Sequence, residues 1–164
     1  QQNTTEAYNM AITQAMSTLF KKDVLLGDHH LDSDVIMIAL YTSSATLNAT
    51  TDGYITSNEV ANGNGYTTGG VALASKAVTE DTNSASTTAG SGIFDAEDPQ
   101  WTSATFTARG ALIYNKTLGD AADPANSRGA IAILDFGGDF SVSGGTFRIV
   151  FPAPDRNTAI VRID

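Results

Sequence analysis

The stretch Val35-Ile36-Met37-Ile38-Ala39-Leu40-Tyr41 decides how the rest of this sequence is interpreted. It is a continuous apolar run of strand length, without the alternation that would leave one face of a strand in water. A run of this kind is typical of a strand that is buried on both faces. We therefore expect residues 35–41 to lie at the centre of the fold, with other structure packed on either side.

The rest of the chain is divided into short apolar segments by turns rich in glycine, asparagine and proline. Residues 42–64, 80–92 and 115–128 are polar and predict loops, and the pairs Gly137-Gly138 and Gly144-Gly145 predict turns. Further strands are expected within residues 66–79 and at 93–94, 100–107, 108–114, 130–136, 140–142, 146–151 and 159–163. About seven to nine short strands at this spacing predict a mainly β fold, either a β-sandwich or a jelly-roll-like barrel.

One amphipathic helix is predicted, over residues 3–22. Asn3 is a suitable N-cap residue, and Glu6 follows it at the spacing of a capping box. Apolar residues then recur at helical spacing, at Tyr8, Ile12, Ala15, Met16 and Leu19. The sequence therefore divides into an N-terminal helical arm, residues 1–24, and a β-sandwich domain, residues 25–164. The arm either packs on its own domain or docks on a neighbouring subunit.

Composition excludes several classes of protein. The 164 residues fit one domain, the formal net charge is −9, and only 16% of the residues are charged. Nucleic-acid binding needs clustered Lys and Arg to displace counterions from phosphates, and the nine basic residues here are scattered. The chain has no cysteine for a disulfide, and it lacks an apolar run long enough to span a membrane. Its first residues lack the pattern of a signal peptide.

The polar turn at residues 27–34 contains the candidate ion ligands. His29 and His30 are the two histidines of the chain, and Asp28, Asp32 and Asp34 lie beside them. Imidazole and carboxylate groups bind transition metals, and carboxylates bind calcium. However, neighbouring residues in an extended chain point to opposite sides, and the spacing lacks the EF-hand glycine and final glutamate. We interpret the turn as a solvated surface and assign no metal ligand.

No pattern of residues predicts catalysis. Asp95, Glu97 and Asp98 form a second acidic cluster, but they lie on one short turn, whereas a glycosidase holds two carboxylates across a cleft. The Gly-x-Ser-x-Gly motif of serine hydrolases is absent, and no glycine-rich segment precedes a helix and a lysine placed for phosphate binding. We therefore predict a protein that is not an enzyme, with no catalytic or cofactor-binding residue and no cofactor.

Two interpretations remain open for the aromatic residues. Trp101, Tyr54 and Tyr66 would stack on sugar rings if they were exposed, but aromatic side chains serve more often as core or interface anchors. We favour the core for Trp101. Arg109 interrupts an apolar strand, so we expect it at a sheet edge or in a buried ion pair with Asp135 or Asp95.

Taken together, several stretches resemble a family of small virion-associated proteins of tailed bacteriophages, common among marine and cyanobacterial phages. The resemblance covers residues 30–163. The stretches that carry it are Val35-Ile36-Met37-Ile38-Ala39-Leu40-Tyr41-Thr42-Ser43, Asn58-Glu59-Val60, Gly65-Tyr66-Thr67-Thr68-Gly69-Gly70, Phe94-Asp95-Ala96-Glu97-Asp98, Trp101-Thr102, Thr107-Ala108-Arg109-Gly110-Ala111-Leu112-Ile113-Tyr114, Leu134-Asp135-Phe136-Gly137 and Thr146-Phe147-Arg148-Ile149-Val150-Phe151-Pro152.

The resemblance implies a structural role in the phage particle. Within that role we favour a head decoration (cement) protein that binds the major capsid protein and stabilises the shell, as a homo-oligomer and by preference a trimer. Its expected location is the capsid surface of the virion, after synthesis in the cytoplasm of the bacterial host. The alternative is a tail, baseplate or fibre-head component that binds a receptor or a glycan. Neither role involves nucleic acid or a membrane.

Overall fold

The computed structural model describes residues 11–81, 90–119, 128–155 and 157–164. Within these ranges the chain forms one helix and eight strands, which make two antiparallel sheets. In chain order the elements are β1 (Ala15–Met16), α1 (Thr18–Leu26), β2 (Ile36–Tyr41), β3 (Val71–Ala72), β4 (Ala77–Asp81), β5 (Ser91–Asp95), β6 (Gln100–Asn115), β7 (Ala130–Arg148) and β8 (Val161–Ile163). The prediction of a mainly β fold with a helix near the N-terminus is confirmed.

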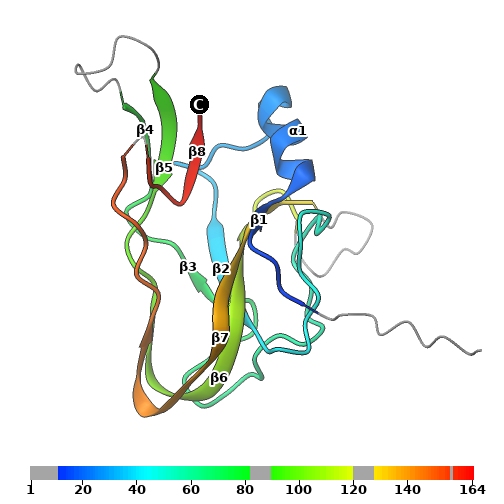
Figure 1. Ribbon diagram of the computed structural model, residues 1–164, viewed down its shortest axis with the longest axis vertical. Helices are drawn as coiled ribbons and strands as arrows, with labels where there is room; N and C mark the ends of the chain where they lie inside the picture. The colour runs from blue at the N-terminus through cyan, green and yellow to red at the C-terminus, as the bar shows by residue number, and fades with distance from the viewer. Residues whose placement is uncertain (1–10, 82–89, 120–127, 156) are drawn as a thin grey trace, which may run out of the picture.

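The larger sheet has the strand order β1-β7-β6-β2-β3, and the smaller sheet has the order β4-β5-β8. Figure 1 shows the smaller sheet at one end of the molecule, beside α1, while β6 and β7 curve together toward the opposite end. The two sheets do not close into a barrel, because within the described ranges each keeps two edge strands. The barrel form of the predicted fold is therefore wrong, and the form with two sheets remains. No helix in these ranges is long and apolar enough to span a bilayer.

Strand β2 is buried on both faces, as its sequence predicted. Ile36, Ile38 and Leu40 point into a core that is shared by the two sheets. Ala39 and Tyr41, on the opposite face, point into a second core. Its neighbour on one side is β6, in a register that pairs all six residues of β2 with residues 110–115, and on the other side it pairs with the short β3.

The second core is covered by the long segment between β2 and β3. This segment lacks extended strands, as the sequence predicted, but it is not merely a surface loop. Leu47, Tyr54 and Ala45 are buried in it and pack against Tyr41 and Leu112 of the larger sheet. The segment therefore forms a third layer on the larger sheet.

The turns predicted at Gly137-Gly138 and Gly144-Gly145 are wrong. Strand β7 runs through both pairs, and its pairing with β6 shifts register around each of them. Gly137 and Gly144 have φ angles of +74° and +64°, values that glycine adopts without a steric penalty. Bulges of this kind admit extra residues and bend a strand pair. The sequence signals that resembled chain reversals are therefore bends in one long two-stranded ribbon.

The predicted helix is displaced along the chain. Residues 3–10 lie outside the described ranges, and the helix that the structure contains begins at Thr18 and ends at Leu26. Ala15 and Met16, which were expected on its apolar stripe, form β1 and pair with β7 instead. The backbone N–H of Ser17 also donates to Ile131 at 2.9 Å. Pairing with an existing sheet edge thus overrides the helical spacing, and residues 11–24 pack on the main body.

Candidate functional site

In the acidic turn before β2, the carboxylates of Asp28, Asp32 and Asp34 each contact a different partner. Asp34 Oδ2 accepts hydrogen bonds from the Asn115 side-chain amide at 2.6 Å and from the backbone N–H of His30 at 2.9 Å. Asp32 accepts a bond from the neighbouring Ser33 hydroxyl at 3.3 Å, and Asp28 pairs with an arginine from another loop. In the part of the chain that the structure describes, no three His, Asp or Glu residues are arranged to hold a metal ion.

That arginine is Arg128, which joins the turn to α1. Its Nη2 atom lies 3.0 Å from Asp28 Oδ2 and 3.0 Å from Oδ2 of Asp23, a fully buried residue of the helix. Asp23 and then Asp28 raise the pKa of Arg128. Asp23 was not among the predicted site residues, although it follows the buried Phe20 at helical spacing and therefore lies on the inner face of the helix. A buried carboxylate needs such a cation to offset its lost hydration.

His29 is held between α1 and the end of β6. Its ring packs edge-on against Phe20, with 4.8 Å between the ring centroids, and its Nδ1 lies 3.3 Å from the amide nitrogen of Asn115. Burial lowers the pKa of His29 below its ordinary value of 6.5, against the opposing effect of Asp23 and Asp34. His30 is exposed. The two histidines therefore do not face one ion, and His29 has a packing role.

A second polar cluster, which sequence analysis did not find, centres on Glu59 in the segment that covers the second core. Its carboxylate accepts hydrogen bonds from the hydroxyls of Tyr54 and Tyr66, each at 2.5 Å, and from the backbone N–H of Gly69 at 2.7 Å. The Tyr66 hydroxyl in turn accepts the backbone N–H of Leu40 at 3.0 Å. One carboxylate thus ties three points of the covering segment together and, through Tyr66, to β2.

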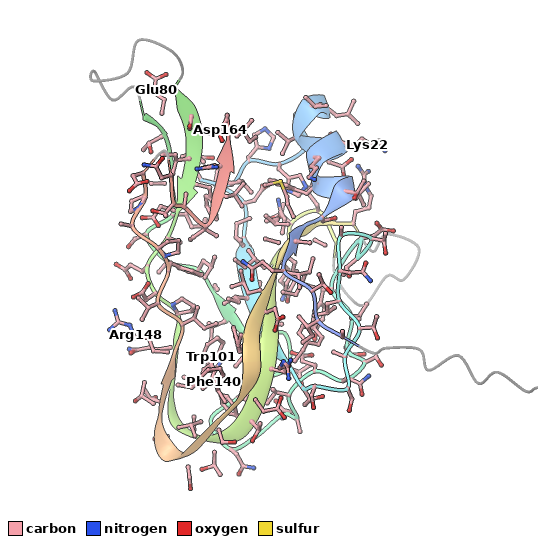
Figure 2. The ribbon with its side chains drawn as sticks, in the orientation of Figure 1. Lys22, Glu80, Trp101, Phe140, Arg148 and Asp164 are labelled. Carbon is pink, nitrogen blue, oxygen red and sulfur yellow. The ribbon has the colours of Figure 1, made fainter. Side chains whose placement is uncertain are left out.

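The aromatic residues considered for sugar binding are in the core. Trp101, Tyr54 and Tyr66 are 3%, 8% and 2% exposed, so the interpretation of Trp101 as a core residue is confirmed, and stacking of these three residues on sugars is wrong. Trp101 lies between Tyr66 and Phe147, at 6.3 and 5.9 Å between ring centroids. Figure 2 labels Trp101, which lies near the start of β6.

The buried tyrosines predict instability at alkaline pH. Burial, followed by hydrogen bonding to Glu59, raises the pKa of Tyr54 and Tyr66 above their ordinary value of 10.0. Because the folded pKa exceeds the unfolded one, the contribution to stability is complete below pH 10.0 and is lost as the pH rises further. We expect the free energy of unfolding to fall steadily above that pH in urea titrations. In Tyr66→Phe the fall should be shallower, and an unchanged slope would contradict this account.

The other charged candidates form local contacts. Asp98 pairs with Arg148 at 2.8 Å and also accepts the backbone N–H of Phe151 at 2.8 Å, while Glu97 accepts the Ser75 hydroxyl at 2.6 Å. These bonds fix connections between strands and do not place two carboxylates across a cleft.

Arg109 lies 3.6 Å from Asp135 and 3.8 Å from Asp139. Of the two partners considered, Asp135 is the one that pairs with Arg109, but the expectation of a buried pair is wrong because both side chains are partly exposed. Asp139 is an additional partner, which the turn predicted at residues 137–138 did not suggest. The pairing with Asp95, the other partner considered, is absent from the ion pairs among the described residues.

Two surfaces carry large apolar side chains that face solvent. The α1–β8 face consists of Leu25, Leu26, Val78 and Ile163, of which Leu25 is 88% exposed. The ribbon patch consists of Phe136, Phe140, Ile149 and Val150, and it surrounds a hollow of about 310 Å³. Figure 2 shows Lys22 and Asp164 at the end of the molecule that carries the first surface, and Phe140 in the other half.

Comparison with protein families, curated proteins and solved structures gave no match. Among the described residues, the two apolar surfaces are the candidate functional regions, because they expose large apolar side chains to solvent. Exposed patches of this kind are typical of sites of protein association. The polar clusters around Asp23 and Glu59 are held by contacts within the chain.

Proposed function

We propose that this protein is a non-enzymatic structural component of a tailed-bacteriophage virion, in which it binds the major capsid protein and stabilises the shell as a decoration protein. The resemblance of residues 30–163 to a family of phage virion proteins is the reason for proposing a role in the virion. The observation that carries the binding role is the ribbon patch, because Phe140 on β7 and Val150 just beyond its end are 54% and 73% exposed.

The chemistry of the patch suits adhesion to another protein. Burying an exposed Val or Phe side chain contributes about 1.5–3 kcal/mol, so a few such residues give weak binding to one capsid subunit. A shell presents the same site many times, and contacts that span neighbouring subunits reinforce one another. Since only 16% of the residues are charged, a large share of the surface can be buried without desolvating ions.

The proposal is tested by adding the protein to shells that lack it and measuring the bound copies by quantitative mass spectrometry. We expect on the order of hundreds of copies, as a repeated lattice site requires, and binding at least tenfold weaker for Val150→Asp. Thr146→Asp adds the same charge at an exposed position on β7 outside the patch, so it should bind normally.

Other results would refute the decoration role. Absence from shells, or equal binding by Val150→Asp and the wild type, would do so directly. A copy number near six or twelve in purified particles, as at a symmetric tail, would favour the tail or baseplate alternative. No observation on the described residues favours a glycan-binding role, because Trp101, Tyr54 and Tyr66 are buried.

A further inference from the structure

Among the residues that the structure describes, one edge of β8 is unpaired, and it borders a trough. β8 is the last strand of the smaller sheet, with β5 as its neighbour on one side. Beyond the other side lie two hollows, one of about 420 Å³ lined by α1 and by Arg162 and Ile163, and one of about 450 Å³ lined by β1 and residues 157–162. Figure 1 shows β8 and α1 as neighbours at one end of the molecule. An edge strand presents backbone groups to which another strand can bind.

The hollow beside the helix is lined mainly by apolar side chains. Met16, Phe20, Val24 and Leu25 form the wall opposite Ile163. Ile163 itself is 53% exposed, and it lies on the same face of β8 as the buried Val161 because alternate residues share a face. A strand placed beside β8 would therefore insert its inward side chain between Ile163 and the helix.

The charge pattern of β8 identifies a fitting occupant. Arg162 and Asp164 flank Ile163 and share the other face of the strand, where they form an ion pair at 3.2 Å. Asp164 also accepts the Ser91 hydroxyl at 2.5 Å, which fixes its carboxylate beside β5. In an antiparallel pair of β8 strands centred on Ile163, each Arg162 lies opposite Asp164 of the other copy. Centring on Arg162 or on Asp164 would place like charges opposite one another, so the charge pattern favours the register centred on Ile163.

We propose that the protein forms a two-fold dimer in which the β8 strands of two copies pair antiparallel about Ile163. The smaller sheets of three strands each would then join into one continuous sheet, and Ile163 of each copy would enter the apolar trough of the other. Such an interface is self-complementary and closes at two copies, in contrast to the trimer that the family resemblance implies. The dimer does not depend on the proposed capsid binding, which uses the other apolar surface.

The test uses light scattering after size exclusion, with charge reversals in two separate variants. The wild type should be a dimer. Arg162→Asp places aspartates opposite each other, and Asp164→Arg places arginines opposite each other, so each variant alone should dissociate at least tenfold more readily. An equimolar mixture of the two should form a heterodimer, because every cross-strand pair then joins Asp to Arg. If each variant dissociated only because it had lost the ion pair between Arg162 and Asp164 within one chain, mixing the two variants would not restore the dimer.

Circular dichroism establishes that both variants are folded before they are mixed. The double variant R162D/D164R should dimerise as the wild type does, and Val150→Asp, on the other surface, should leave the dimer intact. A wild type that is monomeric or trimeric would overturn the proposal, as would a mixture that contains only monomers. A failure of shell binding without any change in the dimer would affect the proposed function alone.

Discussion

Replacing Gly70 with alanine should prevent the protein from folding. The φ angle of Gly70 is +77°, and an added Cβ would lie 1.8 Å from the carbonyl oxygen of Ile38 and 2.8 Å from the Cα of Ala39. These atoms belong to β2, which is held by β6 on one side and β3 on the other, so they cannot yield. We expect a loss of more than about 4 kcal/mol, which approaches the whole stability of a typical domain. Soluble yield and urea unfolding measure it.

Gly63 provides the matched control. Its φ angle is +106°, but an added Cβ would meet no atom within 4 Å. Gly63→Ala therefore introduces only local backbone strain, which costs about 1–2 kcal/mol. If both variants unfold at similar urea concentrations, backbone strain alone governs these sites, and the close approach of Gly70 to β2 has no energetic role.

Glu59→Ala should cause the second-largest loss of stability. The substitution leaves the hydroxyls of Tyr54 and Tyr66 and the N–H of Gly69 without their acceptor in a partly dehydrated site. Hydrogen bonds to a charged group contribute about 1.5–3 kcal/mol each, and orphaned buried donors cost more than solvated ones. We therefore expect the free energy of unfolding to fall by about 3–5 kcal/mol, measured by urea titration at neutral pH.

Two further variants separate charge from hydrogen bonding. Glu59→Gln keeps an acceptor oxygen of the same size, so its loss should be less than half of that caused by alanine. Glu80→Ala removes the same charge from an exposed position on β4 and should be nearly neutral. Equal effects of Glu59→Ala and Glu80→Ala would mean that the cluster around Glu59 does not stabilise the covering segment.

The sequence predicted those parts of the fold that depend on local pattern. The run at residues 35–41 identified the doubly buried strand, and Trp101 was correctly placed in the core. Asp135 was one of the two ion-pair partners considered for Arg109. In these cases a local feature that is unusual in its surroundings narrowed the possible structures to a few.

The remaining features depend on contacts that no local pattern encodes. Ala15 and Met16 fit a helical stripe, but a free edge of β7 captures them. Glycine pairs at 137–138 and 144–145 are consistent with turns or with bulges, and only the length of the partner strand decides between them. In the sequence, Glu59 lies in a polar segment and resembles an ordinary surface residue. Only the folded structure brings Tyr54 and Tyr66 within hydrogen-bonding distance of it.

The ribbon of β6 and β7 also has a consequence for the order in which the chain assembles. Tyr114 pairs with Ala130, only 16 residues away. The pairing therefore closes a short loop, and the loss of chain entropy on closure is small. Ala15, by contrast, pairs with Ile133, 118 residues further along the chain. Local pairings form fast and distant ones slowly. We therefore expect the ribbon to form early in folding, and we expect β1, with only two paired residues, to dock late and to detach early.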